Sequence, residues 1–198
     1  LQKGCAICCA MASIFKIGCL TRWHRPHIIK RSAVEVTNVK GTLVAIARKS
    51  KPGQVMEEVN SATIDVDTGI EGDWRGTPRV GGPDDRQISV LSAEAWQSVC
   101  QDVGNDLPWT YRRANLLVKG LELSHTTGDR LTLGPVTLEI TCETVPCERM
   151  DEQLTGLTQA LVPDWRGGVC CRVISGGSIK VGQSVTHLTN SNKEKISS

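Results

Sequence analysis

The stretch Thr141–Met150 (TCETVPCERM) decides the fold because it joins two segments of different periodicity. Before it, apolar and polar residues alternate, which predicts a half-buried strand whose inner face is formed by Val136, Leu138, Ile140 and Cys142. After it, the spacing of apolar residues predicts one face of a helix, formed by Met150, Leu154, Leu157 and Leu161. Cys147 is therefore expected where a strand passes into a helix.

Cys147 is the first candidate for chemistry. Unpaired N–H groups and the dipole at a helix start favour a negative sulfur, so we expect the pKa of this thiol to be lowered. Arg149 acts in the same direction and Glu148 opposes it. The alternative interpretation is that Cys147 is a small apolar filler in a loop.

Composition favours sheet over helix bundles. A chain of 198 residues can bury one ordinary core, and aromatic residues make up only 4% of it. Such a core is built from Val, Ile, Leu and Thr, which suit pleated sheet. The 19 glycines indicate frequent tight turns. A β-rich domain is the prediction.

Charge is divided unevenly along the chain. Residues 1–34 hold six Lys and Arg and no acidic residue. The formal net charge of the whole chain is +2, so the remainder has a net charge of 2 − 6 = −4. An acidic body argues against nucleic acid as the main partner, because that binding needs clustered cations. We expect a small-molecule substrate or a protein partner.

The nine cysteines are expected to be free thiols. Four of them lie in the first 20 residues, and most of the others lie within expected helices and strands. Cys170 and Cys171 are adjacent on a strand and face opposite sides, so they cannot share a metal site. This usage indicates a reducing compartment, and we expect a cytoplasmic protein.

Three regions are expected along the chain. Residues 1–33 are an extension that contributes nothing to the core; their apolar run is interrupted by Lys16 and is too short to span a membrane. Their basic composition also suits a transit peptide, so organelle targeting remains the alternative to the cytoplasm. Residues 34–188 form the domain, and residues 189–198 form a polar tail.

Within the domain, alternation predicts strands over 34–39 and 43–47, as a pair or one bent strand, and further strands over 59–66 and 87–91. A helix begins after Ser92 and ends at Gly104. Residues 128–140 and 177–185 each resemble a β-hairpin with a glycine turn.

Two polar segments are candidate binding sites. The glycine-rich loop over 69–86 contains Asp73 and Arg86, and such backbone with arginines can hold an anion or simply form a solvated connection. Arg112, Arg113 and Asn115 lead into an apolar strand. They are rim charges, or they bind a phosphate or carboxylate through paired donors.

The order of six motifs resembles the MOSC family, named after the C-terminal domain of molybdenum cofactor sulfurase, over residues 34–188. The motifs are Glu71-Gly72-Asp73 with a Gly-Gly-Pro-Asp loop, Arg112-Arg113-Ala114-Asn115-Leu116, Gly128-Asp129, Pro146-Cys147, Arg166-Gly167-Gly168 and the closing Val181-Gly182-Gln183-Ser184-Val185. Many relatives have a histidine shortly after the Gly-Asp of the first loop, where this chain has Trp74 and Arg75. Gln183 stands where the closing motif usually has Asp.

The resemblance implies a β-rich α+β fold, a MOSC-like β-barrel with a few peripheral helices. It implies a pterin cofactor of molybdenum or tungsten, with Cys147 as the catalytic residue and metal ligand. The cofactor-binding residues implied by the motifs or chosen from the two polar segments are Arg112, Arg113, Asn115, Arg166, Gly167, Gly168, Asp73 and Arg86.

The resemblance leaves three functions open. The first is an oxidoreductase that reduces N-hydroxylated compounds and needs a separate electron-donating reductase, because no second cofactor motif is present. The second is a sulfur carrier or cofactor chaperone with a persulfide on Cys147, which implies a partner such as a pyridoxal phosphate-dependent cysteine desulfurase. The third is a binding module without chemistry. A serine hydrolase is disfavoured, because none of the four histidines lies in a marked stretch.

Overall fold

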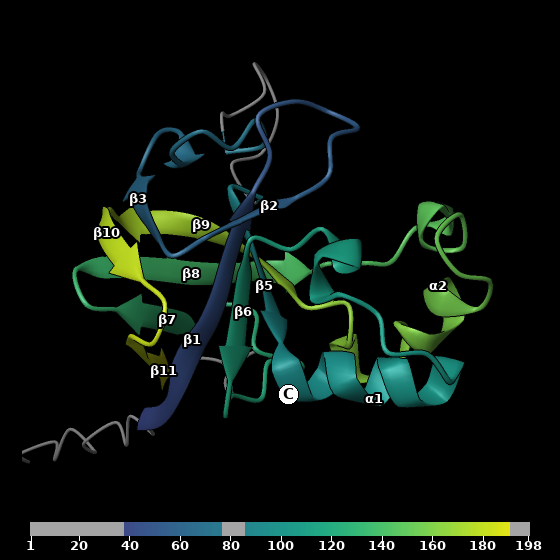
Figure 1. Cartoon of the computed structure of the whole chain (residues 1–198). Coiled ribbons are helices and arrows are strands. Elements are labelled where there is room, and N and C mark those ends of the chain that lie inside the picture. The colour runs from purple at the N-terminus through teal and green to yellow at the C-terminus, as the bar shows by residue number, and fades with distance from the viewer. Residues whose placement is uncertain (1–37, 77–85, 191–198) are drawn as a thin grey trace, which may run out of the picture. The chain divides into compact units, whose positions relative to one another are not determined.

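The structure is a computed structural model that describes residues 38–76 and 86–190 (Figure 1). The elements are, in chain order, β1 (Asn38–Arg48), β2 (Glu57–Val59), β3 (Ser61–Asp65), β4 (Gly69–Ile70), β5 (Ile88–Ser92), α1 (Ala93–Val103), the 3-10 turn η1 (Trp109–Arg112), β6 (Leu116–Lys119), β7 (Arg130–Leu133), β8 (Val136–Glu143), η2 (Glu148–Met150), α2 (Leu157–Ala160), η3 (Pro163–Trp165), β9 (Val169–Ser175), β10 (Gly177–Lys180) and β11 (Ser184–Leu188).

Seven strands close into a mixed β-barrel in the order β11-β7-β8-β9-β5-β6-β1, because β11 also pairs with β1. The β5–β6 pair is parallel and the other barrel pairs are antiparallel. β2 extends the sheet beside β1, and β10, β3 and β4 form a second small sheet. Closure pairs strand edges that an open sheet would leave exposed. The prediction of a β-rich barrel with few helices is confirmed.

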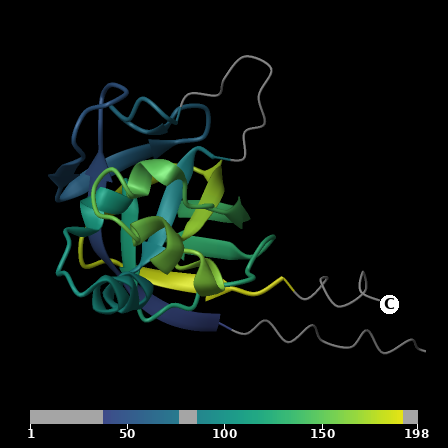
Figure 2. The same cartoon turned by 90° about the vertical axis from the view of Figure 1, so that its right-hand side faces the viewer.

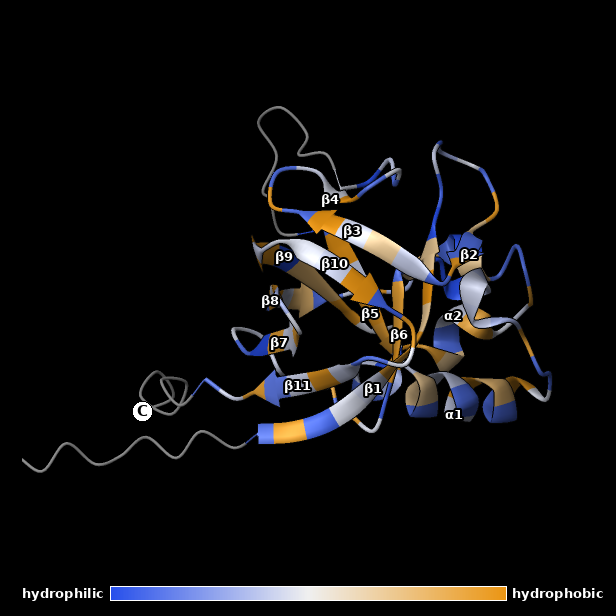
Figure 3. Ribbon diagram, turned by 60° about the vertical axis from the view of Figure 1, so that its left-hand side comes forward, coloured by the Kyte–Doolittle hydropathy of each residue, from blue (hydrophilic) through white to orange (hydrophobic). Residues whose placement is uncertain are grey.

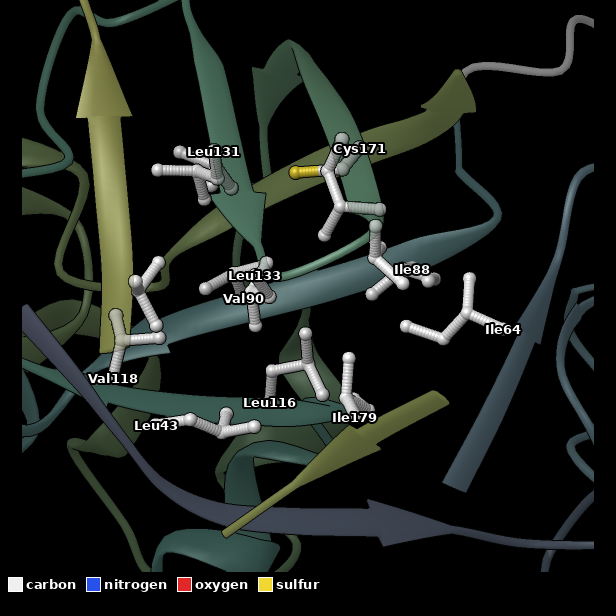
Figure 4. Packing of buried hydrophobic residues seen from close by; sticks show 14 of the residues in the cluster. Leu43, Ile64, Ile88, Val90, Leu116, Val118, Leu131, Leu133, Cys171 and Ile179 are labelled. Atoms are coloured by element: carbon white, nitrogen blue, oxygen red, sulfur yellow. The ribbon is translucent and has the colours of Figure 1, made fainter. Parts of the chain in front are cut away.

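Branched aliphatic side chains fill the barrel, as the composition predicted. Figure 4 shows Leu43, Val90, Leu116 and Leu131 converging from different strands, and each is almost completely buried. Cys171 belongs to the same cluster, whereas its neighbour Cys170 does not. The two cysteines therefore face opposite sides of β9, as expected.

The helices pack on one side of the barrel (Figures 1 and 2). α1 has polar and apolar faces (Figure 3), and it buries Trp96 and Val99. Its boundaries follow the prediction: the Ser92 side chain accepts a hydrogen bond from the backbone N–H of Ala95, and Gly104 ends the helix at φ 66°. Among the described residues, no helix is long and apolar enough to cross a membrane.

The prediction of a helix after Cys147 is wrong, but the residues predicted to form its apolar face do pack together. Only the turn η2 and the four residues of α2 are helical, because Gly156 adopts φ 89° between them. The four apolar residues still pack in one cluster with Trp96 and Val99. Apolar spacing thus predicted which residues are buried but not a continuous helix.

Two other expectations need correction. β10 and β11 are not a hairpin, because β10 pairs with β3 and β11 pairs with β1 and β7. Of the two alternatives expected for the first alternating segments, a strand pair or one bent strand, the second agrees with the structure, in which residues 38–48 form one strand. Cys142 is not on the inner face of β8, because a bulge after Ile140 changes the register. The expected extension, residues 1–33, and most of the tail lie outside the described residues.

Candidate functional site

The site is built on the segment that leaves β8. Cys147 is exposed and directly precedes η2. Its carbonyl oxygen accepts hydrogen bonds from the backbone N–H of Met150, at 2.8 Å, and from the Thr158 hydroxyl, at 3.2 Å. These bonds hold the backbone of Cys147 and leave its thiol open. A three-residue turn follows it, so a helix dipole does not explain how this sulfur would be activated.

Arg113 brings a positive charge to the Cys147 sulfur. It follows η1 and has a left-handed backbone, with φ 60° and ψ 32°, a conformation that is uncommon for arginine. Its Nη2 lies 3.7 Å from the Sγ of Cys147. The guanidinium places a positive charge and a hydrogen-bond donor beside this sulfur. The structure therefore brings together Arg113 and Cys147, which were both predicted from the sequence as site residues.

Two further cations extend the positive region. Lys49, at the end of β1, is only 5% exposed. Arg75 donates from Nη1 to the carbonyl oxygen of Arg113 at 3.4 Å. Burial first, and then the charges of neighbouring arginines, lower the pKa of Lys49 and that of Arg75, and Asp73 opposes both effects. We call Lys49, Arg75 and Arg113 the cation cluster.

Trp74 lies within the cation cluster. Lys49 Nζ is 6.0 Å and Arg75 Cζ is 5.9 Å from the centre of a Trp74 ring. Such contacts offset part of the cost of bringing cations together. The buried Nε1 of Trp74 and Nε of Arg113 have no hydrogen-bond partner among the described residues. Unused donors beside excess positive charge fit an anionic ligand.

Lys49 and Arg75 were not among the site residues predicted from the sequence. The signal that was available was the Trp74-Arg75 pair at the place where relatives have a histidine. Lys49 carried a weaker signal, as one cation in a basic stretch that follows an apolar strand. Only the fold shows that these residues meet Arg113.

Asn115 and Asp73 are buried and bonded to the protein itself. Asn115 Oδ1 accepts from the N–H and hydroxyl of Ser89, at 3.1 and 2.9 Å. Its Nδ2 donates to Asp73 Oδ2 at 3.0 Å and to the carbonyl oxygen of Ala47 at 3.3 Å. Asp73 also accepts from the backbone N–H of Lys49 and Arg75. We infer that both residues position the cation cluster rather than touch a ligand.

Arg112 and the two glycines brace the loop before Cys147. The buried Arg112 donates to the carbonyl oxygens of Gly167, at 2.8 Å, and Thr144, at 2.6 Å. Its burial lowers its pKa to about 10. A Cβ atom on Gly167 would lie 2.5 Å from the Thr144 carbonyl oxygen, and one on Gly168 would lie 2.3 Å from that of Val90. These positions serve close backbone packing beneath the loop.

Arg166 and Arg86 were also predicted to bind the cofactor, but their recorded interactions are not with Cys147. Arg166 Nη1 pairs with Asp102 Oδ2 at 2.5 Å, and Arg166 lines a surface hollow of about 420 Å³ beside the start of α1 that Cys147 does not line. Arg86 is exposed, and its charge acts on Cys170. The Gly-Gly-Pro-Asp loop between Gly76 and Arg86 lies outside the described residues.

The donor set fits a cofactor that supplies most of its own metal ligands. Among residues 38–76 and 86–190, no group of three His, Cys, Asp or Glu side chains could hold a metal ion. A single open thiol beside a cation cluster instead suits a soft metal attached to an anionic organic group. Cys147 would contribute the sulfur ligand, and Lys49, Arg75 and Arg113 would offset the negative charge.

A closed mixed β-barrel with an open cysteine beside a cation cluster defines the class of protein. The sequence profile of the MOSC domain matches residues 77–186. The chain belongs to the MOSC domain family, and members of this family are associated with binding of the molybdenum cofactor.

Solved structures share the fold. The YuaD protein of Bacillus subtilis is similar with a TM-score of 0.67 and 19% identity over 78% of this chain and 99% of its own. YiiM of Geobacillus stearothermophilus has a TM-score of 0.59 and 18% identity, and the match covers 76% of this chain and 75% of that chain. YiiM of Escherichia coli has a TM-score of 0.57 and 15% identity, and the match covers 75% of this chain and 70% of that chain. None of the curated proteins matches this sequence significantly.

Proposed function

We propose that the protein binds a molybdenum or tungsten pterin cofactor, with Cys147 as the metal ligand, and reduces N-hydroxylated compounds. The observation that carries the proposal is the 3.7 Å contact between the open Cys147 thiol and Arg113, which belongs to a cation cluster with unused buried donors. A phosphorylated, metal-bearing pterin has the negative charge and the soft metal that this arrangement would bind.

The residues of the chain have separate tasks in this proposal. When bound, the metal supplies the two-electron chemistry of the reduction. Arg113 donates to the sulfur of Cys147 and orients it for ligation. Lys49 and Arg75 hold the negative group of the cofactor, while Asp73 and Asn115 fix the backbone from which both cations project. A separate reductase supplies the electrons, and a cytoplasmic location is part of the proposal.

A second candidate function is a sulfur carrier. It is favoured by the exposure of Cys147, because a desulfurase-type partner needs direct access to the thiol that receives the sulfur. The same Arg113 would stabilise the anionic persulfide. Here Cys147 accepts a sulfane sulfur from a partner protein and passes it on without a bound metal.

The metal content of the protein distinguishes the two functions. The full chain is purified from cells that make the cofactor, without chelators, and molybdenum, tungsten, pterin and labile sulfane sulfur are measured per chain. About one metal and one pterin per chain, lost in Cys147→Ser, supports the oxidoreductase. Metal-free protein with sulfane sulfur on Cys147 supports the carrier. Protein with neither after exposure to both cofactor and desulfurase would overturn both functions.

A further inference from the structure

The bulge in β8 brings two cysteines to the same side of the sheet. Ile140 lies opposite Cys171, which points into the barrel. Cys142 lies opposite Cys170, so Thr141 is the additional residue of the bulge. Directly opposite residues on neighbouring strands point to the same face, so Cys142 and Cys170 are both on the outer face. Regular alternation would have placed Cys142 inside with Ile140.

Each of the two thiols has a threonine hydroxyl beside it. The Thr141 hydroxyl donates to the carbonyl oxygen of Cys170 at 2.9 Å and lies 3.8 Å from the Cys142 Sγ. Thr144 Oγ1 is 3.2 Å from the Cys170 Sγ. Burial raises the pKa of the Cys170 thiol, and the nearby Cys142 raises it further. The register, which sets the two cysteines opposite each other, places both thiols side by side on the outer face.

The spacing of the strands suits a disulfide. Opposite residues in antiparallel strands have Cα atoms about 4.5 to 5.5 Å apart. Cysteines joined by a disulfide have Cα atoms about 4.4 to 6.8 Å apart. Closing the bond needs side-chain rotation and little backbone movement. Cys142 is half-buried and open to a small reagent, whereas Cys170 is only 4% exposed.

We propose that Cys142 and Cys170 form a redox-active dithiol that small-molecule disulfides convert into a disulfide across β8 and β9. Cys142 is the attacking cysteine because reagents can reach it. Cys170 is the resolving cysteine because it is shielded and adjacent. Nothing in this proposal requires a cofactor on Cys147, so it stands or falls independently of the proposed function.

The oxidation takes place in two thiol–disulfide exchange steps. The Cys142 thiol loses its proton and attacks one sulfur of a small disulfide, whose S–S bond breaks; the leaving thiolate takes up the proton. Cys170 then loses its proton and attacks the Cys142 sulfur, expelling the second thiolate, which is protonated in turn. The two cysteines lose two electrons and two protons, and one disulfide becomes two thiols.

The bond would form at the base of the loop that carries Cys147. Thr144 contacts Cys170 through its hydroxyl, and its carbonyl oxygen accepts from Arg112. Its backbone N–H donates to the carbonyl oxygen of Gly168 at 2.8 Å. Oxidation removes the thiol proton from the Cys170–Thr144 contact and joins the two strands below it. The redox state of the pair is thus transmitted to the segment that leads to Cys147.

The test uses the folded full chain in buffers with graded ratios of reduced to oxidised glutathione. Free thiols are trapped by alkylation, and a protease that cuts after Glu143 separates Cys142 from Cys147. We expect Cys142 and Cys170 to escape alkylation together, as one linked pair of peptides, reversibly on addition of dithiothreitol. Cys170→Ser should accumulate a glutathione adduct on Cys142, and Cys142→Ser should lower oxidation of Cys170 at least tenfold.

Two further cysteine variants test whether the disulfide is specific to Cys142 and Cys170. Cys147→Ser and Cys100→Ser should form the Cys142–Cys170 link as the parent does, with circular dichroism showing that every sample is folded. The proposal is overturned if Cys142 stays fully alkylated at every ratio. It is equally overturned if Cys142 links instead to Cys171 or Cys147, or if the link needs Cys147.

Discussion

Nη2 of Arg113 lies 3.7 Å from Sγ of Cys147, although the two residues are 34 positions apart in the sequence. Arg113 reaches the sulfur from a left-handed backbone conformation that costs an ordinary side chain about 1–2 kcal/mol. A conformation of this cost is often kept where a side chain must reach a functional group. The strain and the charge at Arg113 can be tested together.

Arg113→Asn should leave the apoprotein as stable as the parent or more stable. Asparagine tolerates the left-handed region better than arginine, and the variant lacks the buried Nε that has no hydrogen-bond partner within the described part of the chain. Cofactor retention should fall, because a hydrogen bond to a charged group is worth roughly 1.5–3 kcal/mol, or about tenfold or more in affinity. Denaturant midpoints and molybdenum per chain measure the two effects. A stable variant that keeps its full metal load would show that Arg113 does not bind the cofactor.

Cys147→Ser and Cys171→Ser should have opposite effects. Cys147 is exposed, so its replacement should change the free energy of unfolding by less than about 0.5 kcal/mol while metal or sulfane sulfur is lost. Cys171 is completely buried in the barrel, so a serine hydroxyl there lacks an assured partner and should cost about 1–3 kcal/mol. The surviving Cys171→Ser protein should keep its metal. Unfolding curves and metal analysis on both variants decide whether the working cysteine has been chosen correctly.

Asn115→Ala should destabilise the protein by at least about 2 kcal/mol, because it leaves both Asp73 and the backbone N–H of Ser89 without a bond that they now make. Ser89→Ala is the matched control. It removes one hydroxyl and keeps the backbone bond to Asn115, so it should cost about 1 kcal/mol. If Asn115→Ala were as stable as the parent and only cofactor binding fell, Asn115 would be a direct ligand rather than a positioning residue.

Gly168→Ala should be costly for a reason that Gly104→Ala does not share. Both glycines have positive φ, at 86° and 66°, so alanine strains either by about 1 kcal/mol. At Gly168 the new Cβ would also meet the Val90 carbonyl oxygen at 2.3 Å, whereas at Gly104 nothing lies within 4 Å. We expect roughly 3 kcal/mol against 1 kcal/mol in denaturant unfolding. Equal losses at the two positions would contradict the close packing of Gly168 against β5.

The cation cluster should make the apoprotein more stable as the pH rises. Burial and neighbouring arginines lower the folded pKa of Lys49 below its ordinary 10.5, so the unfolded chain binds more protons between the two values. Stability therefore increases with pH through that window and gains nothing further from Lys49 above it. Lys49→Met removes this contribution and should raise stability at pH 7. Unfolding free energies from pH 7 to 10.5 measure the slope, and a variant with the parent's slope and lower stability would refute the account.

Local chemistry by itself determined several features of this protein. Ser92 and Gly104 marked both ends of α1 because capping and left-handed termination depend on neighbouring residues only. The alternation over Val136, Leu138 and Ile140 predicted which side chains enter the barrel for the same reason. The order of short motifs indicated the family, the barrel and Cys147 as the residue to examine.

Tertiary structure decided the strand pairing and register, which local sequence patterns do not specify. The pairing of β10 with β3 and of β11 with β1 depends on distant strands, so a local hairpin signal was misleading. The bulge that turns Cys142 toward Cys170 arises from the register between β8 and β9, which alternation in one strand does not specify.

Within the site, too, some residues could be predicted from the sequence and others only from the fold. Arg113 and Cys147 could be selected from their motifs, whereas Arg75 and Lys49 had weaker signals that did not show that the two residues lie near Arg113. They reach Arg113 through the closure of the barrel and through the bonds of Asp73 to the loop backbone. Sequence identified the thiol and one of its cations; only the folding together of distant segments created the buried positive charge around them.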